Sequence, residues 1–139
     1  VYERYVSLGN LAAKPDPNLL YGQNRPYVEK IIRDHFPTPK SLRILELACG
    51  PAPFLFLLKQ RGYSNLVGID TSPEQVALAH AVGLEKEVLQ GDMLEFLNAT
   101  ELEEYDIIIL FDILEHFKAF ILNPNSGKKW LKVTLKDIE

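Results

Sequence analysis

The stretch Arg43-Ile-Leu-Glu-Leu-Ala-Cys-Gly-Pro-Ala-Pro-Phe54 decides the fold of this chain. It opens with an apolar run that is typical of a buried strand, and it continues into small residues that lead into a helix. A strand, a tight small-residue turn and a helix in this order form the nucleotide-binding turn of many α/β folds. We therefore expect Glu46 near the end of a central strand, followed by a turn made by Ala48, Cys49 and Gly50.

Two more acidic residues follow apolar runs further along the chain. Asp70 comes after Leu-Val-Gly-Ile, and Asp92 comes after Val-Leu-Gln-Gly. In an open parallel sheet the carboxyl ends of the strands share one edge, where ligands bind. Glu46, Asp70 and Asp92 are therefore predicted to lie together at one site.

Composition narrows the class of protein. A chain of 139 residues with 47% hydrophobic residues is long enough for one domain with a core of its own. A net charge of -4 offers no basic surface for nucleic acid, and one cysteine excludes an internal disulfide. Neither a membrane-spanning run nor a secretory signal is visible, so we expect a cytoplasmic protein without membrane or nucleic-acid partners.

Strand-like and helix-like segments alternate along the chain. Strands are expected at residues 43–48, 66–70, 86–90, 105–111 and 129–135. Helices are expected at residues 53–61, 73–82, 93–98 and 113–122, after an earlier one that runs from Arg25 to His35. The apolar runs, such as Ile107-Ile-Ile-Leu-Phe111, are continuous, which favours a sheet covered on both faces. The fold class predicted is therefore α/β, with an open and mostly parallel sheet.

The starts of two helices carry local signals. Ser72 offers an N-cap hydroxyl, Pro73 fits the first helical position, and Gln75 completes a capping box. Gly83 is placed to end this helix in the left-handed conformation. Asn24 is the expected N-cap of the earlier helix. Residues 1–24 form an N-terminal arm or lid, broken at residues 14–18, and residues 25–139 form the main domain.

Four motifs resemble, in order and spacing, those of the class I S-adenosylmethionine-dependent methyltransferases. They are Glu46-Leu-Ala-Cys-Gly-Pro-Ala52, Gly68-Ile-Asp-Thr-Ser-Pro73, Gln90-Gly-Asp-Met93 and Tyr105-Asp-Ile-Ile-Ile-Leu-Phe-Asp-Ile-Leu-Glu-His116. The resemblance covers roughly residues 40 to 135 and implies a Rossmann-like fold with about five strands. The family's usual sixth and seventh strands are missing from this sequence. An incomplete sheet edge of that kind would favour self-association.

By this resemblance, the turn passes under the methionine part of S-adenosylmethionine, and Glu46 orders it. Asp70 would hold the ribose hydroxyls, because a carboxylate accepts two hydrogen bonds from a vicinal diol. Asp92 would accept from the adenine amino group while Met93 packs on the ring. Tyr21 of the arm would close over the site. The residues expected to bind the cofactor are Glu46, Ala48, Cys49, Gly50, Asp70, Thr71, Ser72, Asp92, Met93, Phe111 and Tyr21.

The expected reaction is methyl transfer to a small-molecule acceptor. Transfer from a sulfonium depends mainly on positioning and on exclusion of water. For an oxygen or nitrogen acceptor, His116 is the first candidate for a general base and Asp112 the second. No metal site is predicted.

Other interpretations stay open at this point. Asp92 and Asp112 each precede a helix with a glutamate at the capping-box spacing, so either can serve as an N-cap alone. Cys49 fits a small buried core residue better than a nucleophile. A nicotinamide-dependent dehydrogenase needs more glycine in the turn than this chain has. Ala48, Ala52 and Pro53 also depart from the methyltransferase pattern. Together with the missing strands, these departures favour a non-catalytic binding or interaction module as the alternative function.

Overall fold

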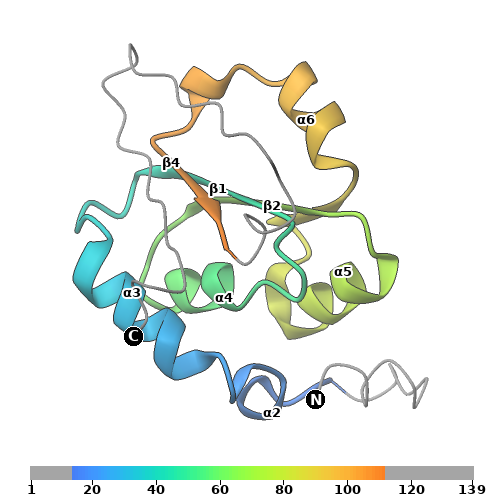
Figure 1. The fold of residues 1–139 in the computed structure, drawn as a ribbon. Helices are drawn as coiled ribbons and strands as arrows, with labels where there is room; N and C mark the ends of the chain where they lie inside the picture. The colour runs from blue at the N-terminus through green and yellow to red at the C-terminus, as the bar shows by residue number, and fades with distance from the viewer. Residues whose placement is uncertain (1–13, 112–139) are drawn as a thin grey trace.

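The computed structural model describes residues 14–111, and within them it forms one open α/β sheet flanked by helices (Figure 1). The strands are β1 (Arg43–Leu47), β2 (Asn65–Asp70), β3 (Val88–Gln90) and β4 (Ile107–Leu110). The helices are α2 (Pro17–Tyr21), α3 (Arg25–His35), α4 (Pro53–Gln60), α5 (Pro73–Ala79), the π-helical turn η1 (His80–Leu84), α6 (Met93–Ala99) and the 3-10 turn η2 (Leu102–Glu104). The predicted alternation is confirmed over this range.

Several predictions concern residues outside the described range. They include the helix at 113–122, the strand at 129–135 and the two candidate catalytic side chains, Asp112 and His116. Within the described range, no helix has the length and apolar character that crossing a membrane requires.

The sheet is parallel throughout its described part, in the order β3-β2-β1-β4. The chain moves outward from β1 to β3 and then returns to place β4 on the other side of β1. This reversal between β1 and β4 is the position at which open α/β sheets bind ligands, beyond the carboxyl ends of the strands. Glu46 occupies this position, because it pairs in register with Gly68 of β2 and Ile109 of β4.

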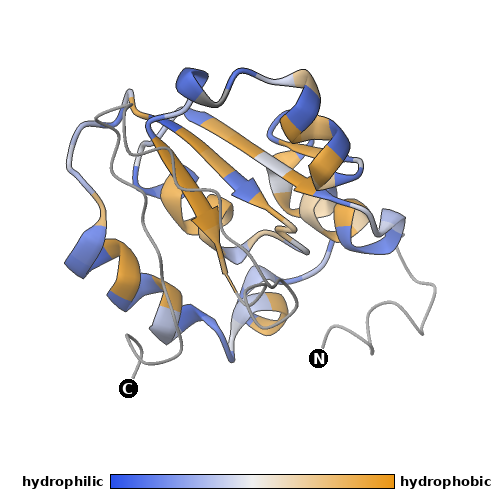
Figure 2. Ribbon diagram, turned by 45° about the horizontal axis from the view of Figure 1, so that its top comes forward, coloured by the Kyte–Doolittle hydropathy of each residue, from blue (hydrophilic) through white to orange (hydrophobic). Residues whose placement is uncertain are grey.

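The two faces of the sheet are covered unequally. Helices α3, α4 and α5 lie on one face, whereas α6 lies on the other (Figure 1). The first face holds most of the buried side chains, including Ile44, Phe54 and Leu58. The apolar character of the strands and of the inward helix sides is visible in Figure 2. Helices on both faces confirm the predicted class, but α6 has no buried residue, so its face is thinly covered.

Two expectations about the N-terminal segment need correction. The break expected at residues 14–18 covers only residues 14–16 of the described chain, because Pro17 and Asn18 already belong to α2. Asp16 starts that helix by accepting a hydrogen bond from Asn18 N at 2.9 Å. Asn24 does not cap α3 with its side chain, since its backbone is itself near-helical, with φ -91° and ψ -21°. An N-cap normally has extended backbone, which aims its side chain at the first helical N–H groups.

The start and end of α5 are largely as predicted. Ser72 Oγ accepts from Gln75 N at 3.4 Å, and Gly83 has φ 101°. The predicted capping box is wrong in its second half. The N–H of Ser72 donates to Asp70 Oδ1 at 2.9 Å, and Gln75 Oε1 has no hydrogen-bond partner among the described residues. The competing carboxylate of Asp70 therefore replaces the glutamine.

Candidate cofactor site

The turn after β1 is built from alternating left-handed residues. Ala48, Gly50 and Ala52 have φ values of 50°, 58° and 61°. This region costs an L-residue such as alanine about 1–2 kcal/mol, so other contacts must maintain it. Two of these are main-chain bonds, from Cys49 N to Ile69 O at 3.0 Å and from Ala52 N to Cys49 O at 2.9 Å. Ala52 thus adopts the positive φ that its side chain disfavours.

Asp70 fastens this turn to the end of β2. Its Oδ2 accepts from Gly50 N at 2.8 Å, and its Oδ1 accepts from Ser72 N at 2.9 Å. Each carboxylate oxygen can accept about two hydrogen bonds, so both retain capacity for a ligand hydroxyl. The half-buried Asp70 carboxylate is therefore held in one orientation at the mouth of the turn.

Tyr21 supports the turn from α2. Its side chain is 1% exposed, its hydroxyl donates to Pro51 O at 2.6 Å, and its ring lies 5.0 Å from that of Phe56. The hydroxyl expected to close over a cofactor thus contacts the main chain of the turn itself. A contact across 30 residues fixes this segment against the candidate site.

Glu46 is the most unusual side chain of the site. It is 2% exposed, and its Oε2 has no hydrogen-bond partner among the described residues. Burial raises the pKa of Glu46 well above its usual range, and the negative charge of Asp70 raises it further. A carboxyl group in this position favours the arrival of a cation, which would supply the missing partner.

Cys49 does not have the character of a nucleophile. It is 4% exposed, and burial, followed by the charges of Glu46 and Asp70, raises the pKa of its thiol far above the usual range. The thiol therefore remains protonated at neutral pH, whereas a reactive cysteine needs the thiolate. This agrees with the core interpretation of Cys49.

The remaining predicted cofactor residues of the described range lie along the same edge of the sheet. Asp92 caps α6, since its Oδ1 accepts from Leu94 N at 2.9 Å and from Glu95 N at 3.0 Å. The capping interpretation is thus confirmed, and the second carboxylate oxygen takes part in neither bond. Met93 packs half-buried against the α6 face of the sheet. Thr71 is exposed beyond β2.

Phe111 directly follows β4, on the other side of β1. Its ring packs edge-on against Phe54 with 5.2 Å between the centroids. This contact joins the end of β4 to the first turn of α4. Phe111 is thereby held at the reversal in strand order, where the methionine part of the cofactor was expected.

Sequence reasoning missed two residues that shape the turn. A Cβ on Gly68 would lie 2.6 Å from Leu55 Cδ1 and 2.9 Å from Cys49 Sγ, so only glycine fits there. Gln75 Oε1 is buried and lies 3.7 Å from the position of a Cβ on Gly50. The only signal for Gly68 was its place two residues before Asp70.

A small-residue turn after the first strand, with the acid that ends the second strand beside it, matches the arrangement that the four motifs implied. Residues 44–123 match the family described as "Methyltransferase domain". The chain belongs to the class I S-adenosylmethionine-dependent methyltransferase family.

Two individual proteins are similar to this methyltransferase domain. The human protein "EEF1A lysine methyltransferase 2" is 33% identical over 104 residues, which are 72% of this chain and 42% of that protein. The 2.2 Å crystal structure of WbdD matches with a TM-score of 0.49 and 25% identity, over 75% of this chain and 24% of that one. The chain thus spans less than half the length of either.

Proposed function

We propose that this chain binds S-adenosylmethionine and takes part in methyl transfer to a lysine side chain of a protein. The observation that carries the proposal is the Asp70–Gly50 bond, which holds the left-handed turn beside the buried Glu46, whose Oε2 has no hydrogen-bond partner among residues 14–111. The protein acceptor is supported by the name of the human relative, a lysine methyltransferase. The small-molecule acceptor expected from the sequence has no such support.

The residues present fit the proposed cofactor. Asp70 is oriented to accept from the ribose hydroxyls, and Asp92 has an oxygen outside its capping bonds for the adenine amino group. Glu46 offers a buried carboxyl group to the positively charged methionine part. When bound, the cofactor supplies an electrophilic methyl group on a sulfonium.

The work of the described residues is positioning. The turn is held by Asp70 on one side and by Tyr21 on the other, so it needs little rearrangement to receive a ligand. A preorganised site spends less of its binding energy on ordering loops. The proton that a lysine ammonium must lose before attack would pass to a base such as His116 or Asp112, which stay predictions.

The alternative function, a binding module without catalysis, rested in part on the alanines of the turn. Ala48 and Ala52 nevertheless adopt positive φ, at 50° and 61°. The departures from glycine therefore do not prevent the turn from forming. This geometry favours a competent cofactor site over a degenerate one.

Calorimetric titration with S-adenosylhomocysteine tests cofactor binding. We expect micromolar affinity for the purified chain. The acceptor is then sought by incubating the chain with tritiated S-adenosylmethionine and either a cell extract or a panel of small amines, followed by acid hydrolysis. Label in methylated lysine supports the proposal. Label only in small amines, or no binding of S-adenosylhomocysteine, contradicts it.

A further inference from the structure

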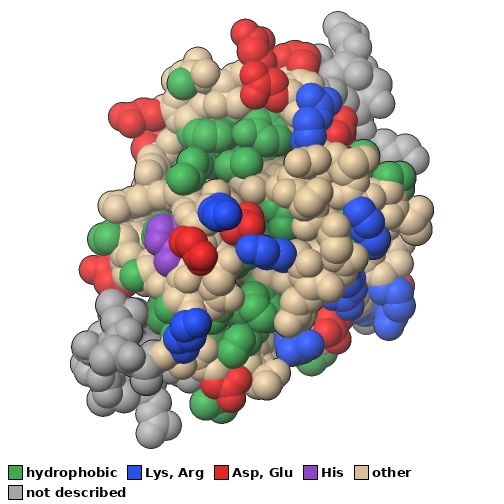
Figure 3. Space-filling model, turned by 180° about the vertical axis from the view of Figure 1, so that it is seen from behind, with side chains coloured by type: hydrophobic (Ala, Val, Ile, Leu, Met, Phe, Trp, Pro, Cys, Tyr) green, Lys and Arg blue, Asp and Glu red, His purple; other side chains and the backbone are tan. Residues whose placement is uncertain are grey.

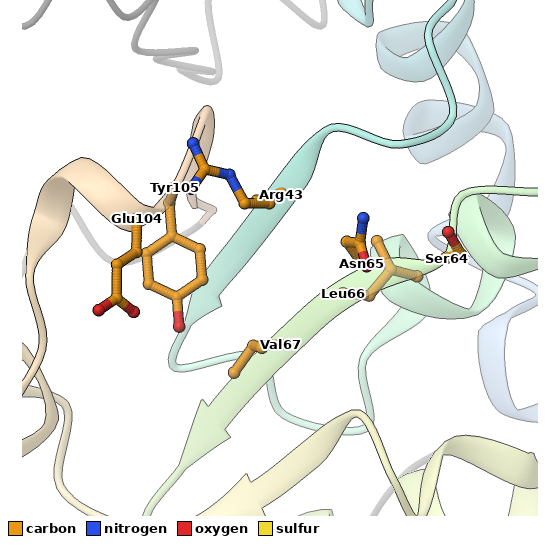
Figure 4. A pocket seen from close by; sticks show the side chains of 7 residues that line it. All are labelled: Arg43, Ser64, Asn65, Leu66, Val67, Glu104 and Tyr105. Carbon is orange, nitrogen blue, oxygen red and sulfur yellow. The ribbon is translucent and has the colours of Figure 1, made fainter.

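A second concave surface lies at the opposite edge of the sheet, where the strands begin. This hollow, which we call the amino-edge hollow, has a volume of about 530 Å³ (Figure 4). Its lining residues are Arg43, Ser64, Asn65, Leu66, Val67, Glu104 and Tyr105. They come from the starts of β1 and β2 and from the segment that leads into β4. None of them belongs to the candidate cofactor site.

The floor of the hollow is apolar, and α6, the helix on this face of the sheet, is short. Its seven residues span only about 10 Å. Val67 and Tyr105 pack at the margin of the core on this face and remain half-buried. Figure 3 shows hydrophobic side chains gathered on the back of the molecule, next to a group of acidic ones.

The charge beside the hollow is negative. The segment that leads into β4 carries Glu101, Glu103, Glu104 and Asp106, and residues 101–106 contain no basic residue. The one cation of the lining, Arg43, is already paired with Asp106, at 3.2 Å between Nη2 and Oδ1. Glu104 lies close enough to Tyr105 to add to the rise in the pKa of its phenol, which burial causes first. A carboxylate and an aromatic ring therefore stand together on one wall, as Figure 4 shows.

We propose that the amino-edge hollow binds a lysine or arginine side chain of the protein acceptor. The aliphatic stem would lie along Val67, as long basic side chains do on apolar surface. The cationic end would meet the Glu104 carboxylate and the ring of Tyr105, which attract it by charge and by cation–π interaction. This inference rests on the proposed function in one respect, namely that the acceptor is a protein.

The bound residue is distinct from the one that is methylated. β1 has five residues, so the two edges of the sheet are separated by roughly 15 Å at about 3.3 Å per residue. An extended segment of five or six residues spans that distance. One basic segment can therefore present a lysine at the carboxyl edge while a second basic side chain occupies the hollow. Such two-point attachment raises affinity without a new catalytic contact.

The test is an NMR titration of the ¹⁵N-labelled chain with acetylated and amidated decalysine at low salt, without cofactor. We expect amide shifts concentrated at Asn65, Val67 and Tyr105. Glu104→Gln should weaken binding at least fivefold, whereas Glu85→Gln, the same change of charge at an exposed site after η1, should alter it less than twofold. Tyr105→Leu should weaken binding and Tyr105→Phe should preserve it.

The opposite results overturn the proposal. Equal losses in Glu104→Gln and Glu85→Gln would show only general attraction to an acidic surface. No binding of decalysine would mean that the hollow does not accept free basic segments, for example because another part of the chain occupies it. Failure of the proposed function is distinguishable, because it would appear as a lack of S-adenosylhomocysteine binding by the wild-type chain. The Glu104 and Tyr105 variants should bind S-adenosylhomocysteine as the wild type does.

Discussion

Each edge of the sheet has an aspartate that accepts hydrogen bonds from backbone N–H groups, but the charges of the two aspartates are treated differently. At the amino edge, Asp106 accepts from Arg43 N at 2.9 Å and also pairs with the Arg43 guanidinium, in a partly exposed position. At the carboxyl edge, Asp70 accepts from Gly50 N and Ser72 N, and no basic side chain within residues 14–111 pairs with it. The first acid is neutralised and joins strands. The second pairs with no basic side chain of the described range and lies beside a buried carboxyl group whose pKa is raised, which is typical of a ligand site.

Replacing the acid at the carboxyl edge should have the largest effect. In Asp70→Asn, the side-chain amide nitrogen cannot accept a hydrogen bond. One of the two backbone N–H donors, of Gly50 or of Ser72, therefore loses its acceptor and faces another donor. We expect the affinity for S-adenosylhomocysteine to fall more than about 100-fold, or about 2.7 kcal/mol. Calorimetric titration with S-adenosylhomocysteine measures this loss of affinity.

Asp106→Asn at the amino edge is the matched control. It should leave the affinity for S-adenosylhomocysteine within twofold, because Asp106 lies at the other end of the strands. Similar losses in both variants would mean that the acids act only through the stability of the sheet, and the contrast between the edges would fail.

Gly68→Ala should destabilise the chain where the turn meets the sheet. The added methyl group would lie 2.6 Å from Leu55 Cδ1 and 2.9 Å from Cys49 Sγ. Overpacking of this kind costs about 1–3 kcal/mol, so we expect a loss of about 2 kcal/mol in urea unfolding. The same change at Gly91 meets its nearest atom at 3.9 Å and serves as the control. A Gly68→Ala variant as stable as Gly91→Ala would show that Leu55 and Cys49 move aside.

The buried carboxyl of Glu46 should make stability depend on pH. Its pKa is raised in the folded chain, so its contribution is full below the unfolded pKa of about 4.5 and is lost as pH rises through the folded value. Glu46→Gln has no such group. We therefore expect the free energy of unfolding of the variant to rise relative to that of the wild type as pH rises from 4.5 through the folded pKa of Glu46.

Thermal unfolding from pH 4 to pH 8 measures this difference. The variant should at the same time bind S-adenosylhomocysteine more weakly, because the carboxyl group that costs stability is the one offered to the α-ammonium group of the ligand. A constant difference in Tm across this range would show that Glu46 does not remain buried and protonated.

Much of the fold was predictable because its signals are local. The apolar runs and the small-residue turn located every strand in the described range, and Ser72 and Gly83 marked a helix start and end correctly. The partners of polar side chains were less predictable. Asn24 has the residue type of an N-cap but not the backbone, and Gln75 lost its expected partner to Asp70. In both cases the hydrogen bonds depend on which groups lie close together in the folded chain. A short stretch of sequence does not contain that information.

In the candidate site, too, positions along the chain were predictable and contacts between distant residues were not. The position of Asp70 at a strand end was predictable from the run before it, but its bond to Gly50, 20 residues away, was not. Gly68 was missed because its role depends on Leu55 and Cys49, which reach it from a helix and a turn. Tyr21 was expected over the site, yet its hydroxyl bonds to the turn from α2, since that helix packs against the sheet-covering helices through Leu20 and Leu78.

The smallest effect should come from the backbone of the turn itself. Ala48 is exposed and has φ 50°, so Ala48→Gly removes the left-handed cost without leaving a cavity. The greater freedom of glycine in the unfolded chain offsets part of this gain, and we expect a net stabilisation of about 0.5 kcal/mol in urea unfolding. Ala52 has a similar φ of 61° but is fully buried, so Ala52→Gly also loses packing and should gain less. If Ala48→Gly destabilises the chain instead, the main-chain bonds and the Asp70 tether hold the turn without strain, and the alanines are as suitable there as glycine.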